Sequence, residues 1–531
     1  MPELPPIDSA LETIELVLLM FAVAVGVSYL ARRIAIPVPI LLLVAGVVLG
    51  LLPDLPRLEL EPDVVFALFL PPILFGAAYF TPIRDFRANA RAILLLAVGH
   101  VLFITVAVGF VANATIPGMG IAVALTLGAI VAPPDAVAAT AIFQRLGVPR
   151  RIVTILEGES LINDATSLTA YRAATAAALG LMTFSVVGST VDFLIIGVGG
   201  VVAGILVGAV MTALLRRTRD PVLEIAVTLL APATAYLFAE RFGLSGVLAT
   251  VVAGLITGRR AARVLSPDAR LLGRGAWQIL IWAINAFVFL AIGLQLPVIL
   301  QGLSSIPPDE LLRYAVIISL TVIVGRFLWV FPATYLPRYL SRKLRERDPY
   351  PAVRAVVIVS WAGMRGVVSL AAALALAPDF PQRPLILYLT FCVIVATLVG
   401  QGMTLPWVIR KLGVTAAGDG LDAEETHARL AAVDAGLHRL EELREEYPGH
   451  LPLIDQIKDE LEHEVSHVAP GEDIALDEAQ QEALDHRAIR AAVLVAQRET
   501  VIQLRDDGVI NDETLRRIEL ELDLEAVRSG A

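Results

Sequence analysis

Thirteen long apolar runs follow one another through the first 411 residues of this 531-residue chain. Each has roughly 17 to 30 residues, and about 20 apolar residues let a helix cross the ~30 Å hydrocarbon core of a bilayer. With 56% hydrophobic and 18% charged residues, the chain is too apolar for a soluble globular protein. We therefore predict an all-α polytopic membrane protein with thirteen transmembrane helices, at residues 11–31, 37–53, 61–80, 92–112, 118–143, 152–180, 189–215, 221–239, 243–258, 276–300, 312–336, 353–377 and 384–409.

Basic residues gather at every second connection between these predicted helices. Cytoplasmic connections of membrane proteins are enriched in arginine and lysine, so the alternation gives the orientation. It predicts an N-terminus outside the membrane and a cytoplasmic C-terminus, and it fits an odd number of spans. The basic residues lie at or near the connections after helices 1, 3, 5, 7, 9 and 11: Arg32 and Arg33; Arg84, Arg87 and Arg91; Arg145, Arg150 and Arg151; Arg216, Arg217 and Arg219; Arg259, Arg260, Arg263, Arg270 and Arg274; and Arg338, Arg342, Lys343, Arg345, Arg347 and Arg354.

The chain changes character after Lys411. From Leu412 to the end it has 29 acidic and 11 basic residues, which is a net charge of −18, whereas the whole chain has a net charge of −10. Apolar residues recur at helical spacing within residues 430–440 and 489–496. We therefore predict two domains: a transmembrane domain at residues 1–411 and a cytoplasmic, acidic, helical domain with a regulatory role at residues 412–531.

Charged and polar residues interrupt the sixth predicted span. The stretch LEGESLINDATSLTAYR at residues 156–172 contains Glu157, Glu159, Asn163, Asp164 and Arg172. An ionisable residue at the centre of a bilayer helix costs at least about 2.5 to 3.5 kcal/mol, so such residues usually line a pathway and pair with one another. We take this stretch as the candidate functional site.

Helix breaks are expected in the fifth and twelfth spans. The two prolines of APPDAV (132–137) remove backbone donors and clash with the preceding turn, and glycines flank Met364 and Arg365 in WAGMRG (361–366). Both motifs and Asp164 lie roughly 10 to 20 Å from the cytoplasmic ends of their spans at 1.5 Å per residue. Two interrupted helices in corresponding halves are typical of an inverted-repeat transporter, here with helices 1–6 matching helices 8–13.

Four polar residues share one face of the sixth helix. Glu159, Asn163, Ser160 and Asp164 fall within about 140° at 100° per residue. Their carboxylate, amide and hydroxyl oxygens suit a hard monovalent cation, which backbone carbonyls of the unwound fifth helix could also bind. For Ser160 or Asn163 alone, hydrogen bonding between membrane helices is an equally good interpretation; for the set with Asp135 and Arg365, a functional site is favoured.

Three segments resemble the monovalent cation/proton antiporter 1 family, the bacterial Na⁺/H⁺ exchangers related to animal sodium/hydrogen exchangers. They are GAIVAPPDAVAATAIF, ILEGESLINDATSLTAYR and SWAGMRGVVSLAAAL, in the fifth, sixth and twelfth predicted spans. The resemblance covers residues 11–411. It implies a homodimer in the bacterial inner membrane, in which each protomer has a dimerisation domain and a core domain that carries the ion site.

The resemblance also implies roles for individual residues. Asp164 matches the aspartate that binds Na⁺ or the proton, and Asn163 completes an Asn-Asp pair associated with electroneutral exchange. Ser160 and Asp135 match residues that shape the site, and Glu159 matches a glutamate expected to pair with Arg365 of the broken helix. At Pro134 many members have threonine, so a hydroxyl is lost here although the backbone carbonyl remains available as a ligand.

The expected function is exchange of one Na⁺ for one H⁺ by alternating access, with Li⁺ as a further candidate ion, because a buried carboxylate can bind either a cation or a proton. Exchange of K⁺ for H⁺ by the same fold is the main alternative. A cation channel is disfavoured because no TVGYG-like filter is present. An enzyme is disfavoured because the chain has a single cysteine, and because His463 and His467, four residues apart in HEVSH within the acidic tail, form only a weak metal signal without further ligands. We expect no cofactor apart from the transported ions, and no nucleic-acid partner.

Overall fold

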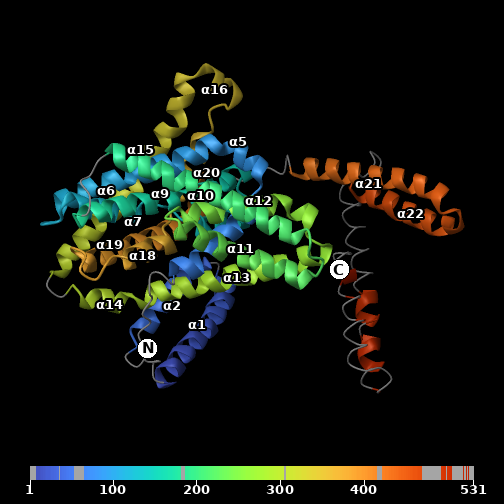
Figure 1. The fold of residues 1–531 in the computed structure, drawn as a ribbon, viewed down its shortest axis with the longest axis horizontal. Helices are drawn as coiled ribbons and strands as arrows, with labels where there is room; N and C mark the ends of the chain where they lie inside the picture. The colour runs from blue at the N-terminus through green and yellow to red at the C-terminus, as the bar shows by residue number, and fades with distance from the viewer. Residues whose placement is uncertain are drawn as a thin grey trace. The chain divides into compact units, whose positions relative to one another are not determined.

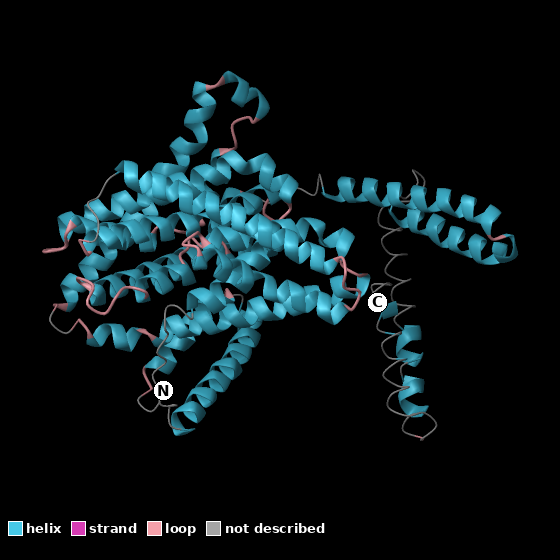
Figure 2. Ribbon diagram, viewed as in Figure 1, coloured by secondary structure: helices cyan, strands magenta, loops and turns pink. Residues whose placement is uncertain are grey.

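The computed structural model describes residues 7–34, 36–52, 65–180, 186–303, 306–414, 421–468, 492–497 and 499–504, with a few single positions beyond. Within these ranges the chain forms helices and no strand (Figure 2). It divides into two compact units, Met1–Ala416 and Ala417–Ala531. Each unit is described by itself.

The first unit contains two groups of helices that pack mainly within themselves. We call one group the scaffold bundle; in it α10 packs on α12, α13 on α2, and α12 on α4 (Figure 1). Its elements are α1 (Ile7–Ile34), α2 (Val38–Gly50), the π-helical turn η1 (Val65–Phe69), α4 (Leu70–Phe80), α10 (Val186–Leu215), α11 (Pro221–Arg241), α12 (Gly246–Val264), α13 (Pro267–Leu294) and the short α14 (Leu296–Gln301).

We call the other group the site bundle. In it α7 packs against α6 and α9, and α15 packs against α6 and α17. Its elements are α5 (Ile83–Leu94), the π-helical η2 (Leu95–His100), α6 (Val101–Thr115), α7 (Ile121–Val131), α8 (Val137–Leu146), α9 (Arg150–Ala178), α15 (Pro308–Leu340), α16 (Arg342–Arg347), α17 (Val353–Trp361), α18 (Val367–Leu374), α19 (Arg383–Val395), the π-helical η3 (Ala396–Gln401) and α20 (Gly402–Leu412).

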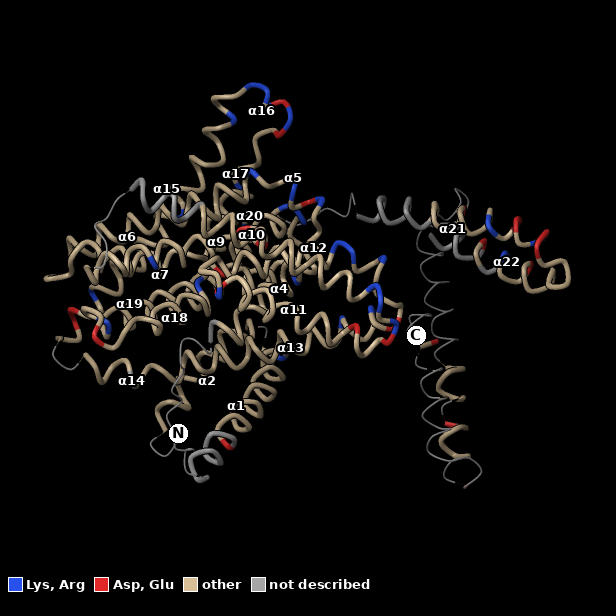
Figure 3. The backbone as a smooth tube through the Cα atoms, viewed as in Figure 1, with Lys and Arg blue, Asp and Glu red and all other residues tan. Residues whose placement is uncertain are grey.

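Six helical segments in the described residues are long and apolar enough to cross a membrane: Ile83–Thr115, Ile195–Leu215, Pro221–Arg241, Pro267–Gln301, Pro308–Leu340 and Arg383–Leu412. Five shorter apolar helices accompany them. Some predicted spans do not reach this length because a break divides them, as between α7 and α8. Helix α9 is long enough, but it carries too many polar residues to count as an apolar span. Charged residues gather at the ends of many helices, whereas most of the helical chain carries none (Figure 3). The unit is thus a multi-pass, all-helical membrane protein.

Both predicted breaks are present in the structure. Residues 132–136 are non-helical between α7 and α8, and residues 363–366 are non-helical between α17 and α18. These stretches form the loop segments inside the helical bundle in Figure 2. Proline and glycine therefore interrupt the two spans where the sequence predicts it.

The second unit contains a helical hairpin of α21 (Leu421–Glu446) and α22 (Leu451–Val468), joined by a short 3₁₀ turn at Pro448–His450. Val433 and Leu440 of α21 and Ile454 of α22 are buried, which agrees with the apolar spacing predicted at residues 430–440. Much of the second predicted stretch, including Ile489, lies outside the described residues.

Candidate functional site

Helix α9 carries the polar stretch through the centre of the site bundle. It begins at Arg150, directly after Pro149, and runs for 29 residues without interruption. Glu159 is 1% exposed, Asn163 is 0% exposed and Asp164 is 6% exposed. Three of the four residues predicted to share one helix face are thus buried, as expected for groups with internal partners, whereas Ser160 is half-buried.

The two interrupted helices touch each other at their breaks. The backbone N–H of Asp135 donates a 2.6 Å hydrogen bond to the carbonyl of Met364. The Asp135 carboxylate accepts a 2.8 Å hydrogen bond from the Val137 N–H at the start of α8, and its other side lies against Gly366, where a Cβ atom would overlap it. A glycine at 366 is therefore required for the two breaks to approach this closely.

Arg365 neutralises the end of a half-helix. Its Nε donates to the carbonyl of Val131 at 3.1 Å and its Nη2 to the carbonyl of Ala132 at 3.4 Å, both at the C-terminus of α7. Nη1 donates to the carbonyl of Gly363 in its own break. These carbonyls lose their helical partners at the break, and a cation there is favourable to the helix dipole. Arg365 thus links the break in one span to the break in the other.

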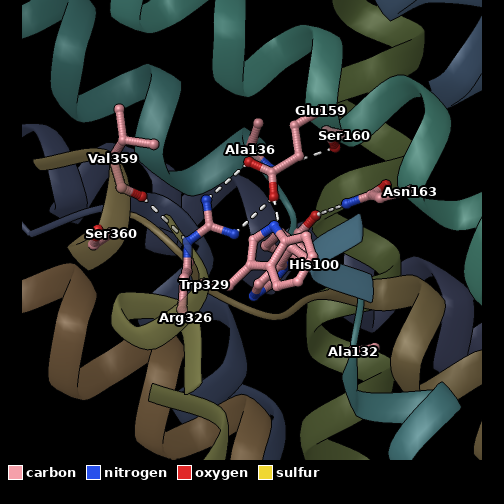
Figure 4. A network of polar contacts seen from close by, with 12 residues as sticks. His100, Ala132, Ala136, Glu159, Ser160, Asn163, Arg326, Trp329, Val359 and Ser360 are labelled. Atoms are coloured by element: carbon pink, nitrogen blue, oxygen red, sulfur yellow. Dashed lines mark hydrogen bonds and ion pairs between the residues drawn. The ribbon is translucent and has the colours of Figure 1, made fainter. Parts of the chain in front are cut away.

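Glu159 forms its ion pair with Arg326 of α15, not with Arg365 as the sequence predicts. The guanidinium Nη1 and Nη2 of Arg326 donate to the two carboxylate oxygens of Glu159 at 2.7 and 2.8 Å (Figure 4). Arg326 is 0% exposed, and its Nε donates to the carbonyl of Val359 at 3.2 Å. The difference has a simple cause. The Arg365 side chain donates to the carbonyls at the end of α7, so Arg326 forms the bidentate ion pair with the Glu159 carboxylate.

His100 lies beside this ion pair, and sequence reasoning assigned it no role. Its Nδ1 is 3.8 Å from Glu159 Oε1, and the ring is fully buried (Figure 4). Neither ring nitrogen has a hydrogen-bond partner among the described residues. One feature of the sequence could have drawn attention to His100: it is the single histidine before residue 412.

A cavity of about 530 Å³ reaches the crossing. Of the predicted cation ligands, Asp164, Ser160, Asp135 and Pro134 line it, whereas Asn163, Glu159 and both arginines lie outside its lining. A neighbouring cavity of about 1160 Å³ shares Thr81, Gln144 and other lining residues with it and extends to Arg259, Arg270 and Arg274. The two cavities together form a path from the crossing to the arginine-rich ends of α12 and α13.

Asn163 joins α9 to the unwound segment behind this cavity. Its Nδ2 donates a 2.6 Å hydrogen bond to the carbonyl of Pro134. Its Oδ1 is buried and has no hydrogen-bond partner among the described residues. An unsatisfied buried acceptor costs about 1 to 3 kcal/mol, so this oxygen suits a bound cation or proton donor. The Pro134 carbonyl already accepts one hydrogen bond and retains a second lone pair.

Known proteins match the chain over most of its length. The family model described as "Sodium/hydrogen exchanger, transmembrane" matches residues 18–411. An uncharacterised Na⁺/H⁺ exchanger of Mycobacterium tuberculosis is 34% identical over 527 residues, covering 97% of this chain and 95% of that protein. An uncharacterised Na⁺/H⁺ exchanger of Escherichia coli is 31% identical over 536 residues, covering 96% and 97%.

Solved structures match the fold as well. The structure of the sodium/proton antiporter MjNhaP1 from Methanocaldococcus jannaschii at pH 8 aligns with a TM-score of 0.57 at 20% identity, covering 73% of this chain and 98% of that chain. At this identity the likeness concerns the fold alone. The family model and the two relatives carry the assignment: the chain belongs to the transmembrane sodium/hydrogen exchanger family.

Proposed function

We propose that this protein exchanges one Na⁺ for one H⁺ across the membrane by alternating access, and that Asp164 binds either ion. The observation that carries the proposal is that Asp164, Asp135 and Ser160 line one cavity at the crossing of two interrupted helices. Interrupted membrane helices form the ion sites of many transporters. The matched family and the names of the relatives, which are Na⁺/H⁺ exchangers, support the same reaction here.

The charges around the crossing support a stoichiometry of one to one. Glu157 also lines the cavity, but it lies seven residues from Asp164, about 10 Å along α9, and is not counted with the crossing. Among the described residues at the crossing itself, Asp135, Glu159 and Asp164 contribute three negative charges, and Arg326 and Arg365 contribute two positive charges. Their sum is −1 when all are ionised, so a single Na⁺ or a single proton neutralises the set. Because net charge is costly to bury, we expect the site to change its exposure only when one of these ions is bound, which makes the exchange electroneutral.

We infer that the cation lies between α9 and the unwound segment of the fifth span. The Asp164 carboxylate supplies the charge, and Ser160 and the carbonyl of Pro134 supply neutral oxygens. Asn163, behind the cavity, would hold the Pro134 carbonyl in position through its hydrogen bond. Ser160 Oγ is 3.4 Å from the Ala136 N–H, a weak hydrogen bond that leaves its lone pairs available. Glu159 and Arg326 would keep α9 in position and stay paired through the cycle.

The helices are consistent with the predicted thirteen spans and inverted repeat. Taking α5 to α6, α7 with α8, α17 with α18 and α19 to α20 as single spans, six spans precede α10 and six follow it. The repeat then relates the α7–α8 break to the α17–α18 break. We propose that α10 links the two halves and that the site bundle moves against the scaffold bundle.

We also propose the topology and assembly implied by the family: a homodimer in the bacterial inner membrane, with the N-terminus outside and the acidic C-terminal unit in the cytoplasm as a regulatory domain. The cavity at Asp164 extends towards Arg259, Arg270 and Arg274. Because arginine-rich connections are cytoplasmic, this arrangement corresponds to an inward-open state.

The test is dissipation of a preset pH gradient in proteoliposomes on addition of Na⁺, Li⁺ or K⁺, with the membrane potential clamped. We expect Na⁺ to collapse the gradient with the wild type and not with Asp164→Asn. Asp379→Asn, the same change at an exposed loop residue, serves as the matched control and should retain the wild-type rate.

The same assay separates the alternatives. A faster response to K⁺ than to Na⁺ would replace Na⁺ by K⁺ as the substrate. Cation flux without proton movement would indicate a channel, and equal rates for wild type and Asp164→Asn would remove Asp164 from the coupling step.

A further inference from the structure

A separate cavity of about 100 Å³ lies between α5, α9, α15 and α17, at an arginine-rich end of the site bundle. Its inner wall is apolar and includes the buried side chains of Leu96, Ile152 and Val356. Three arginines also line it: Arg91 from α5, Arg151 from α9 and Arg338 from α15. The lining therefore combines a basic cluster with an apolar cleft.

The basic cluster has more positive charge than its own contacts neutralise. Asp348, in the connection between α16 and α17, accepts hydrogen bonds from Arg91 at 2.8 Å, from Arg151 at 2.7 Å and from Arg338 at 2.7 Å. One carboxylate thus faces three guanidinium groups, which leaves an excess of two positive charges. The blue segments of α5 and α16 in Figure 3 show further basic residues on these two helices.

One donor in the cluster lacks a partner. Arg91 Nη1 is buried and makes no hydrogen bond to any described residue. The side chains of Arg91 and Arg151 are 32% and 49% exposed, whereas Arg338 is almost fully buried. An anion can therefore approach from the surface and meet an unsatisfied donor and a buried guanidinium, which form strong, charge-assisted hydrogen bonds to phosphate.

We propose that this cavity binds one anionic phospholipid from the cytoplasmic leaflet, with its phosphate on Arg91, Arg151 and Arg338 and part of an acyl chain in the apolar cleft. A free phosphate ion would satisfy the arginines but leave the cleft uncovered, so the apolar wall favours a lipid as the source of the phosphate group. Basic pockets between membrane helices on the cytoplasmic side are suited to anionic headgroups.

The position of the cavity connects the lipid to the ion site. Val359 lines the cavity, and its carbonyl accepts the hydrogen bond from Arg326, which pairs with Glu159. Leu95 also lines it, and its carbonyl accepts a 2.9 Å hydrogen bond from Trp329 Nε1 of α15. A bound lipid would therefore hold together α5, α9, α15 and α17, the helices that carry or adjoin the buried ion pair, and should stabilise the native state by mass action.

The test is the melting temperature of the purified full-length protein in a non-ionic detergent. Phosphatidylglycerol should raise the Tm by at least about 2 °C, whereas phosphatidylcholine or inorganic phosphate should raise it little. Equal stabilisation by both lipids would contradict the proposal, and stabilisation by inorganic phosphate alone would show that the site binds the free anion instead.

Three variants locate the effect. Arg91→Gln removes the unsatisfied donor, and Ala333→Phe fills the cleft while leaving all three arginines; both should lose the Tm increase given by phosphatidylglycerol. Arg216→Gln, at the exposed end of α10, is the matched charge control and should keep it. If Ala333→Phe retains the full increase, the acyl chain does not enter the cleft; if Arg91→Gln and Arg216→Gln behave alike, the lipid effect is a general surface charge effect.

Discussion

The two bundles of the membrane unit are packed by different means. In the scaffold bundle, neighbouring helices approach until backbone meets backbone, because glycines leave no side chain between them. The places where an added Cβ atom would meet the next helix's backbone include Gly46, Gly204, Gly258 and Gly293. In the site bundle, Gly128 makes one such contact, but the glycines at the breaks face charged side chains: Gly363 faces Arg326 and Gly366 faces Asp135.

This difference separates a rigid part from a part that can change. Close helix packing through small residues is stabilised by many van der Waals contacts that have one good geometry. Hydrogen bonds and ion pairs across broken helices depend on ionisation and on bound ions, so their strength changes during a transport cycle. The comparison predicts that charge removal damages the site bundle most and that added volume damages the scaffold bundle most.

The largest effect is expected from Glu159→Gln. It leaves Arg326 fully buried with an unpaired charge, and breaking a buried pair in this way costs about 3 to 5 kcal/mol. We expect a strong loss of thermal stability and of folded protein, measured as the Tm and by size-exclusion chromatography.

Two further variants test that interpretation. Glu346→Gln removes the exposed pair between Arg342 and Glu346, whose side chains are 83% and 64% exposed, and should leave stability nearly unchanged. The double variant Glu159→Gln with Arg326→Gln should be less destabilised than the sum of its single variants. A Glu159→Gln protein as stable as the wild type would contradict the contrast between the bundles.

The next effect concerns the scaffold bundle. In Gly293→Ala the new methyl group would meet the backbone of α2 at Gly46 and Val47, and such overpacking costs about 1 to 3 kcal/mol. Gly275→Ala, in the same helix, has nothing within 4 Å of its added Cβ atom and should be neutral or stabilising by up to about 1 kcal/mol. Equal Tm values for the two variants would show that α13 and α2 are not packed backbone to backbone.

The sequence predicted features that depend on local chemistry better than features that depend on the packing of distant segments. Two adjacent prolines remove hydrogen bonds from the preceding helical turn, and two nearby glycines weaken a helix, so the breaks at residues 132–136 and 363–366 were predictable. The partner of Glu159 was not, because both buried arginines lie on distant spans: Arg326 is 167 and Arg365 is 206 residues away in the chain. Only the folded structure shows that Arg365 donates to the carbonyls at the end of α7, so that Arg326 is the partner of Glu159.

The same limit applies to the cavities. Helical periodicity places Ser160 and Asp164 on one face of α9, yet it does not show that Asn163 turns to the Pro134 carbonyl instead of lining the cavity. Nor could it show that Arg91, Arg151 and Arg338, from three separate connections, meet on Asp348. Positive charge at these connections was predicted as a sign of orientation, not as a binding site.

A smaller effect is expected from Asp348→Asn, at the polar end of the site bundle. Burial acts to raise the pKa of Asp348, but the hydrogen bond from Arg151 and the charges of Arg151, Arg338 and Arg91 outweigh it, so the pKa lies below its usual value. The group therefore stabilises the fold above its unfolded pKa of about 3.9, and this contribution is lost as the pH falls through the lower native value.

The corresponding measurement is Tm against pH for the wild type and for Asp348→Asn. At pH 7 the variant should be destabilised by about 1 kcal/mol, a value reduced for solvent screening, and the difference should shrink as the solution is acidified below pH 4. Asp379→Asn, in an exposed loop, should show no such pH-dependent difference. A difference that is constant with pH would mean that the three arginines do not depend on the ionised carboxylate.

The smallest effect on stability is expected where the two bundles meet. Arg172 of α9 donates to both carboxylate oxygens of Glu240 in α11 at 3.1 Å, about 33 Å along α9 from Arg150 at 1.5 Å per residue. The pair is partly exposed, so Arg172→Gln should change stability by less than about 1 kcal/mol. Because the wide cavity lies towards the other end of α9, the proposed inward-open state places this contact on the closed side of the molecule.

Removing a contact made in only one state shifts the population towards the other state, so Arg172→Gln should favour opening at this end. The opening can be measured with Thr169→Cys, a position beside the ion pair. The chain's single cysteine, Cys392, is first replaced by serine so that only position 169 is labelled. A membrane-impermeant thiol reagent added outside should label Thr169→Cys severalfold faster with Arg172→Gln than without it, whereas Arg241→Gln, the neighbouring exposed arginine, should leave the rate unchanged. Equal labelling in all three backgrounds would mean that the ion pair does not hold the two bundles together, and that closure at this end depends on apolar contacts such as those of Leu168 and Val247 in the same pocket.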